Sequence, residues 1–170
     1  MRRHVNDSKS PLALLTSLPI RWSVALAYTV FVTILLVQSS TQPLVGPPAP
    51  PGPPDLQREL LLTLGHVVTF SLLVIIWWWA GKALLPAPRA LFVAVGFALV
   101  FGLITELAQT AMVDRQASLF DLAVNWTTTI ATATLISERW RKRMALTGQR
   151  TVVENSRRVT SDVRLPRQGL

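Results

Sequence analysis

Seven polar residues that bind ligands or transfer protons in many proteins interrupt an otherwise apolar part of this chain. Their side chains supply an imidazole, two carboxylates, a guanidinium, two amides and a hydroxyl. An ionisable side chain in a bilayer costs about 2.5 to 3.5 kcal/mol for Asp near a helix centre, so it usually faces a bundle interior or a wet cavity. Binding or chemistry is therefore expected at these residues, which are His66, Glu106, Gln109, Arg115, Ser118, Asp121 and Asn125.

Glu106 and His66 are the candidate catalytic residues, because a carboxyl and an imidazole can serve as general acid and base. In that interpretation Arg115 holds a phosphate group. In the alternative interpretation, the seven residues form a polar network that only joins helices. The carboxylates then pair with the guanidinium, the amides and the hydroxyl complete the hydrogen bonds, and His66 donates to a backbone carbonyl or to Glu106.

Several other site chemistries are not expected. The chain has no cysteine, which excludes thiol nucleophiles, disulfides and thiolate metal sites. A metal held by His66, Glu106 and Asp121 is not predicted, because these residues have no recognisable ligand spacing. There is also no G-x-S-x-G nucleophile motif. No cofactor and no metal is therefore predicted.

Four apolar stretches of about twenty residues must position the polar side chains. Half of all residues are apolar and only 15% are charged, and the apolar ones occur in blocks. A helix is expected in each stretch, because a lone strand cannot satisfy its backbone in lipid. The predicted fold is all-α, a four-transmembrane-helix bundle with spans at about 22–38, 60–80, 90–113 and 119–137.

The remaining segments are expected to be short and to carry no second domain. Residues 22–137 form the predicted membrane domain, flanked by a basic N-terminus at 1–21 and a basic, mobile tail at 138–170. The connection at 42–55 contains seven prolines. It is expected to be a stiff, polyproline-like outer loop.

The distribution of positive charge predicts the orientation. Every Lys and Arg except Arg58 and Arg115 lies before the first span, between the second and third, or after the fourth. The positive-inside rule then places both termini in the cytoplasm of a multi-pass protein of the cell membrane. The net charge of +8 reflects this topology and contact with membrane lipids, so a nucleic-acid partner is not expected.

This topology places the polar residues at one depth near the outer face. His66, Glu106 and Asn125 each lie six or seven residues inside the outer end of their span, which is roughly 9 to 10 Å at about 1.5 Å per residue. Glu106 and Gln109 share a helix face, as do Asp121 and Asn125. The polar residues are therefore expected to form one cluster that is open to the outside.

At these positions the chain resembles the VanZ-like membrane proteins, over residues from about 60 to 135. The matching pattern begins with the histidine of the second span and continues across the third and fourth. It consists of His66 and Phe70, then Glu106-x-x-Gln109, then Arg115-x-x-Ser118-x-x-Asp121-Leu122-x-x-Asn125.

The resemblance implies a compact four-helix protein of the cell envelope. The family's namesake is associated with low-level resistance to the glycopeptide teicoplanin. We expect the outward-facing cluster to bind a glycopeptide, a lipid-linked peptidoglycan precursor, a lipid head group or a partner protein, without turnover. The alternative is a membrane-embedded hydrolase or transferase that acts on a lipid-linked envelope substrate, with Glu106 and His66 as its acid-base pair.

Overall fold

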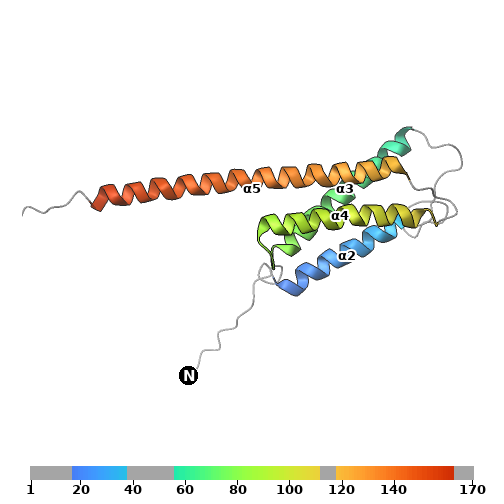
Figure 1. The fold of residues 1–170 in the computed structure, drawn as a ribbon, viewed down its shortest axis with the longest axis horizontal. Coiled ribbons are helices and arrows are strands. Elements are labelled where there is room, and N and C mark those ends of the chain that lie inside the picture. The colour runs from blue at the N-terminus through green and yellow to red at the C-terminus, as the bar shows by residue number, and fades with distance from the viewer. Residues whose placement is uncertain (1–16, 38–55, 112–117, 163–170) are drawn as a thin grey trace, which may run out of the picture. The chain divides into compact units, whose positions relative to one another are not determined.

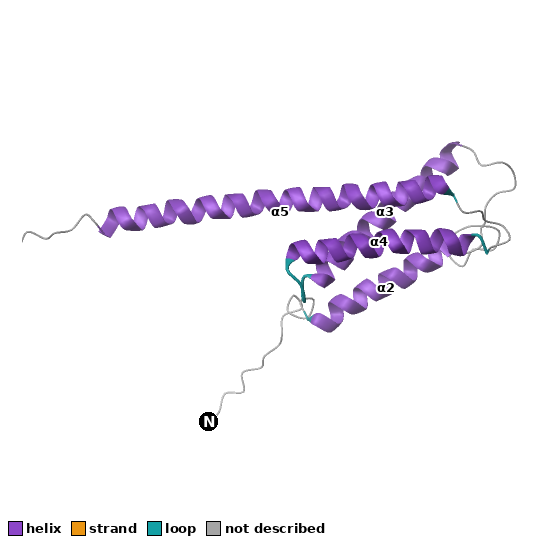
Figure 2. Cartoon of the chain, viewed as in Figure 1, coloured by secondary structure: helices purple, strands orange, loops and turns teal. Residues whose placement is uncertain are grey.

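The computed structural model describes residues 17–37, 56–111 and 118–162, with only the backbone described at 57–59 and 148–162. The described part is entirely helical outside its turns (Figure 2). Its helices are α2 (Leu18–Val37), α3 (Leu56–Gly81), α4 (Ala87–Gln109) and α5 (Leu119–Asp162), as Figure 1 shows. Arg115, the proline-rich loop at 42–55 and most of the N-terminal segment lie outside the described residues.

Three helices are long and apolar enough to cross a membrane, namely Leu18–Val37, Leu60–Gly81 and Ala87–Gln109. Each has 20 or more residues, and about 20 residues of helix span the roughly 30 Å of a hydrocarbon core. The described structure is thus consistent with an integral membrane protein. The fourth expected span, 119–137, lies within α5 and is not among these three, since Asp121, Asn125 and several threonines reduce its hydropathy.

The helix ends differ from the expected spans in ways that local sequence explains. α4 begins at Ala87, three residues earlier than expected, because proline is tolerated in the first turn of a helix. α5 does not end at Ser137 and continues to Asp162. Residues 138–146 are mostly strong helix formers and the next proline is Pro166, so the charges that end an apolar span do not end the helix.

The chain divides into two compact units, Met1–Ala133 and Thr134–Leu170. The second unit contains the C-terminal part of α5, with exposed Trp140, Met144 and Leu146 among its described side chains. The first unit contains α2, α3, α4 and the first 15 residues of α5.

Small residues on one face of α4 let the helices of the first unit approach closely. Every fourth residue from Ala90 through Ala94 and Ala98 to Gly102 is small and buried. A Cβ atom added at Gly81 of α3 would lie 3.3 Å from the Cβ of Ala90. Such small-residue faces allow helices to pack closely in membranes, where burial of apolar surface supplies little driving force.

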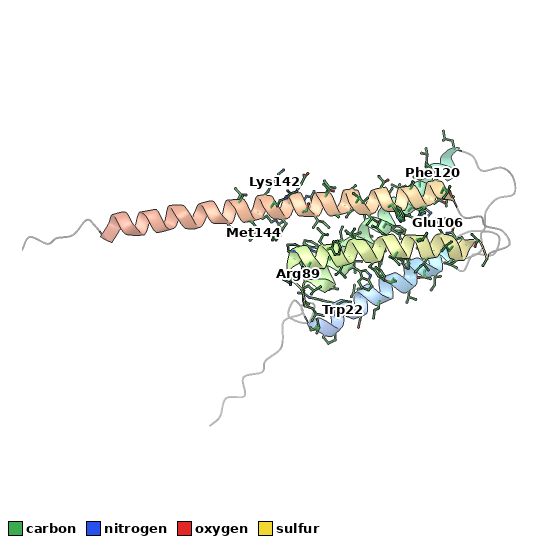
Figure 3. The ribbon with its side chains drawn as sticks, viewed as in Figure 1. Trp22, Arg89, Glu106, Phe120, Lys142 and Met144 are labelled. Atoms are coloured by element: carbon green, nitrogen blue, oxygen red, sulfur yellow. The ribbon has the colours of Figure 1, made fainter. Side chains whose placement is uncertain are left out.

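Beyond Gly102 the same face of α4 becomes polar. Thr105, Glu106 and Gln109 are all buried there. In Figure 3, Glu106 lies toward the opposite end of α4 from Arg89, which lies near Trp22. The first unit therefore has two distinct ends, referred to below as the Glu106 end and the Arg21 end.

Candidate functional site

The central contact of the candidate site joins α3 to α5. His66 Nδ1 lies 2.9 Å from Asn125 Oδ1. With the amide in this orientation, Nδ1 carries the proton and donates it to Asn125. Neutral imidazole has one donor and one acceptor, so Nε2 then presents a lone pair. No described residue forms a hydrogen bond with Nε2.

Asn125 is fully enclosed, with none of its surface exposed. Its Oδ1 is used by His66, whereas its Nδ2 has no hydrogen-bond acceptor within the described part of the chain. Leaving a buried donor unpaired costs about 1 to 3 kcal/mol. The site thus retains a donor on Asn125 and an acceptor on half-buried His66 that intramolecular bonds within the described residues do not use.

The start of α5 is held by a second set of contacts. Ser118 is the residue before the helix, and its Oγ accepts from the Asp121 N–H at 3.2 Å. This is the first half of a capping box. In the usual second half, the acidic residue at the position of Asp121 accepts from the N–H of the cap residue. Here Glu106 of α4 takes that role, with Ser118 N donating to Glu106 Oε2 at 3.0 Å.

Because Glu106 accepts this hydrogen bond in place of Asp121, the Asp121 carboxylate has no hydrogen bond to the described residues. The side chain lies one turn before Asn125 on the same face of α5 and is half-buried. A carboxylate in the first turn is favoured by the helix dipole. Asp121 therefore presents an acceptor one turn from Asn125 on the same face of α5.

Gln109 belongs to a different contact. Its Nε2 donates to the backbone oxygen of Leu36, 2.9 Å away on α2, and its side chain is buried. Leu36 lies in the last turn of α2, where backbone carbonyls have no partner within the helix. Gln109 thus joins α4 to α2 and forms no hydrogen bond with Asn125 or Ser118.

The structure therefore assigns the sequence-predicted residues to three groups. His66 pairs with Asn125, Glu106 accepts from Ser118, whose Oγ in turn accepts from the Asp121 N–H, and Gln109 binds α2. Arg115 lies outside the described residues.

Threonines that the sequence reasoning did not assign to the site extend its polar face along α5. Thr129 Oγ1 donates to the backbone oxygen of Asn125 at 2.8 Å, and Thr132 Oγ1 donates to Ser71 Oγ of α3 at 3.1 Å. Thr128, Thr129 and Thr132 are buried. Their spacing from Asn125, at steps of three, four and seven residues, is the helical signal that predicts one shared face.

Gly102 supports Asn125 from α4. A Cβ atom at this position would lie 3.2 Å from Phe70 Cε1 and 3.6 Å from the Cβ of Asn125. Phe70 is fully buried, so its ring has little room to move. The absence of a side chain at Gly102 therefore sets how closely α4 approaches Phe70 of α3 and Asn125 of α5.

Replacing Gly102 with Val is expected to destabilise the protein by about 1 to 3 kcal/mol, the usual cost of overpacking a core. The matched control is Gly96→Val on the same helix, where an added Cβ meets nothing within 4 Å. Reversible unfolding in detergent micelles measures both variants. Equal stability of the two variants would contradict the close packing at Gly102.

The arrangement leaves an acceptor at Nε2 of half-buried His66 and an enclosed donor at Asn125 Nδ2, and an imidazole held through Nδ1 can also accept a proton at Nε2. Within the described residues, no group of three or more His, Asp or Glu side chains gathers in a way that suits a metal ion. Comparisons with protein-family models, with curated proteins and with solved structures find no match to this chain.

Proposed function

We propose that the chain is a four-span protein of the cell membrane, with both termini cytoplasmic and the Glu106 end facing outward. The burial pattern of α5 supports a fourth span at 119–137. Its enclosed residues are polar, with Asn125 and Thr129 both 0% exposed, while Leu119 and Ile130 are 85% and 56% exposed. A water-soluble helix has the reverse arrangement. Lipid offers no hydrogen bonds, so polar groups turned inward and apolar groups turned outward suit a bilayer.

The function that the site supports best is binding of a polar ligand by a VanZ-like protein of the cell envelope. The observation that carries this proposal is the contact between half-buried His66 and enclosed Asn125, which keeps an acceptor at Nε2 and a donor at Nδ2 beyond its own hydrogen bond. A ligand that carries both donor and acceptor groups, such as an amide, has the chemistry to pair with these atoms. Glycopeptides and the peptide of lipid-linked peptidoglycan precursors both carry such groups, and both occur outside the membrane.

A second candidate function is acid-base catalysis on a lipid-linked envelope substrate. One observation favours it: Asn125 holds the His66 ring through Nδ1 and leaves the Nε2 lone pair available as a base. Glu106 is buried on α4 and accepts from the backbone of Ser118. The catalytic proposal therefore rests on His66 more than on Glu106.

The proposed function is tested by comparing teicoplanin susceptibility and lipid-linked precursor profiles in cells with and without the protein. The binding proposal predicts a change in susceptibility with an unchanged precursor profile. The catalytic proposal predicts an altered precursor. A Thr127→Val variant, changed at an exposed position of α5 and compared at the same expression level, is the matched control. If susceptibility and precursors are both unaffected by the protein, the role in envelope resistance is wrong.

The proposed orientation predicts the result of a reporter experiment. Reporters fused after Asp55 and after Ser118 are expected to read as external, and those after Lys82 and Lys142 as cytoplasmic. The reason is the concentration of Lys and Arg on one side of the spans. Paired alkaline phosphatase and fluorescent protein fusions measure this. External signal after Lys142 with external signal after Ser118 would contradict a fourth span in α5.

A further inference from the structure

The Arg21 end of the first unit, opposite the candidate site, carries two cations that lie on tryptophan rings. The guanidinium carbon of Arg21, in the first turns of α2, lies 5.2 Å from the centre of the Trp79 ring. The Lys82 ammonium, just after α3, lies 3.9 Å from the centre of the Trp78 ring. Such cation–π contacts stabilise a cation by about 0.5 to 2 kcal/mol.

The tryptophans of this end are fixed by contacts of their own. Trp78 Nε1 donates to the Ala87 backbone oxygen at 3.1 Å. Trp77 Nε1 donates to Thr29 Oγ1 at 3.0 Å, and its ring meets Trp22 edge to face with 5.7 Å between centroids. The rings of Trp77 and Trp78 are therefore held against α2 and α4, and Lys82 rests on a fixed indole ring.

Positive charge at this end has no acidic residue beside it in the sequence. No Asp or Glu occurs from residue 60 to 105, a range that includes Lys82, Arg89 and all of α4 up to Thr105. None occurs from residue 8 to 54 around Arg21 either. The helix segments that build the Arg21 end thus contribute cations only.

The Arg21 guanidinium keeps hydrogen-bond donors that an anion could use. Its Nη1 reaches the Trp79 backbone oxygen at 3.4 Å, a long and weak contact. Its Nε is buried and has no acceptor among the described residues, while the side chain as a whole is only half-buried. A guanidinium presents five donors in a planar fork that matches phosphate oxygens.

We propose that the Arg21 end binds the phosphate of an anionic membrane lipid, with Arg21 as its main ligand and Lys82 beside it. Tryptophans and cations at the end of apolar helices lie at head-group level, where basic pockets between spanning helices bind such lipids. A zwitterionic head group carries its own cation and gains less from this surface. The site is separate from the His66–Asn125 pair and does not depend on the function proposed there.

Retention of lipid by the purified full-length protein tests this site. The protein is equilibrated with mixed micelles containing equal amounts of phosphatidylglycerol and phosphatidylcholine, and bound lipids are counted by native mass spectrometry. We expect a preference of about tenfold for phosphatidylglycerol, the ratio that about 1.4 kcal/mol supplies. Arg21→Gln is expected to remove most of this preference. Equal retention of the two lipids by the wild-type protein would overturn the proposal.

Arg89→Gln is the matched control, because Arg89 is an exposed cation at the same end. It is expected to keep the preference within about twofold, since Arg89, unlike Arg21 and Lys82, lies on no tryptophan ring among the described residues. An equal loss of the phosphatidylglycerol preference in both variants would show that general surface charge causes it, and would overturn the specific site. If Arg21→Gln does not fold, Lys82→Gln and Arg21→Lys are measured instead. Undiminished preference in both of these variants would also contradict the proposal.

A last measurement distinguishes a site for a lipid phosphate from a site for free inorganic phosphate. Inorganic phosphate at millimolar concentration is added to the same micelles. A lipid site is expected to retain phosphatidylglycerol, because the acyl chains remain anchored beside the apolar helices. Displacement of the lipid by inorganic phosphate would show that the site recognises the free anion and would overturn the assignment to lipid.

Discussion

Replacing His66 with Asn is expected to abolish the function while leaving the stability of the protein nearly unchanged. Asn places an amide nitrogen at the same distance from Cβ as His Nδ1, so it can still donate to Asn125 Oδ1, which His66 Nδ1 reaches at 2.9 Å. It removes Nε2, the atom that the proposed ligand or substrate would meet. If Nε2 acts as a base, the loss is about 100-fold or more.

The complementary variant His66→Gln separates binding from proton transfer. Gln carries its amide near the position of Nε2 and lacks the group that donates to Asn125. A binding role is expected to survive in part, because an amide can form hydrogen bonds at that position. A catalytic role is expected to be lost, because an amide does not titrate.

Teicoplanin susceptibility and precursor profiles at matched expression measure both histidine variants, and unfolding in detergent measures their stability. His4 is the only other histidine, so nitrogen-15 NMR of histidine-labelled protein with His4 replaced reports the His66 tautomer alone. A proton on Nε2 would contradict the assigned donor. Full activity of His66→Asn would show that the histidine serves only its bond to Asn125.

The helices were predictable because runs of about twenty apolar residues have few structural solutions in a bilayer. The approximate positions of α2, α3 and α4 follow from these runs, although α2 and α3 begin four residues earlier than expected and α4 covers Ala87–Gln109 where 90–113 was expected. The length of α5 could not be predicted in this way. The change from apolar to basic residues after Ser137 indicates where a membrane span ends, but it contains no residue that stops a helix. Helix continuity depends on backbone hydrogen bonds and local propensity, which charged residues satisfy well.

The partner that each polar residue meets was less predictable than which residues share a helix face. Glu106 and Gln109 are three residues apart and both buried, yet they serve α5 and α2 respectively. A step of three residues rotates a side chain by roughly 60° around the helix, enough to face another neighbour. Spacing predicts which residues share a face, but the arrangement of the surrounding helices decides which partner each one meets.

Replacing Glu106 with Leu is expected to destabilise the start of α5, and replacing it with Gln is not. Glu106 is 4% exposed, and its Oε2 accepts from the Ser118 N–H at the residue that caps α5. Leu removes this acceptor and leaves the cap donor unsatisfied, at a cost of about 1 to 3 kcal/mol. The amide oxygen of Gln can still accept from Ser118. Hydrogen exchange at the Ser118 amide measures the effect directly and should accelerate only in Glu106→Leu.

Gln109→Leu is the control for this prediction, because Gln109 is equally buried one turn further along α4 but binds Leu36 of α2. It is expected to lower global stability without accelerating exchange at Ser118. The Gln variant at position 106 then decides the role of the carboxylate. If Glu106→Gln is folded but inactive, Glu106 transfers a proton and the catalytic proposal is favoured. If it is folded and active, Glu106 acts as the cap of α5, and the functional groups of the site are those that His66, Asn125 and Asp121 present beside it.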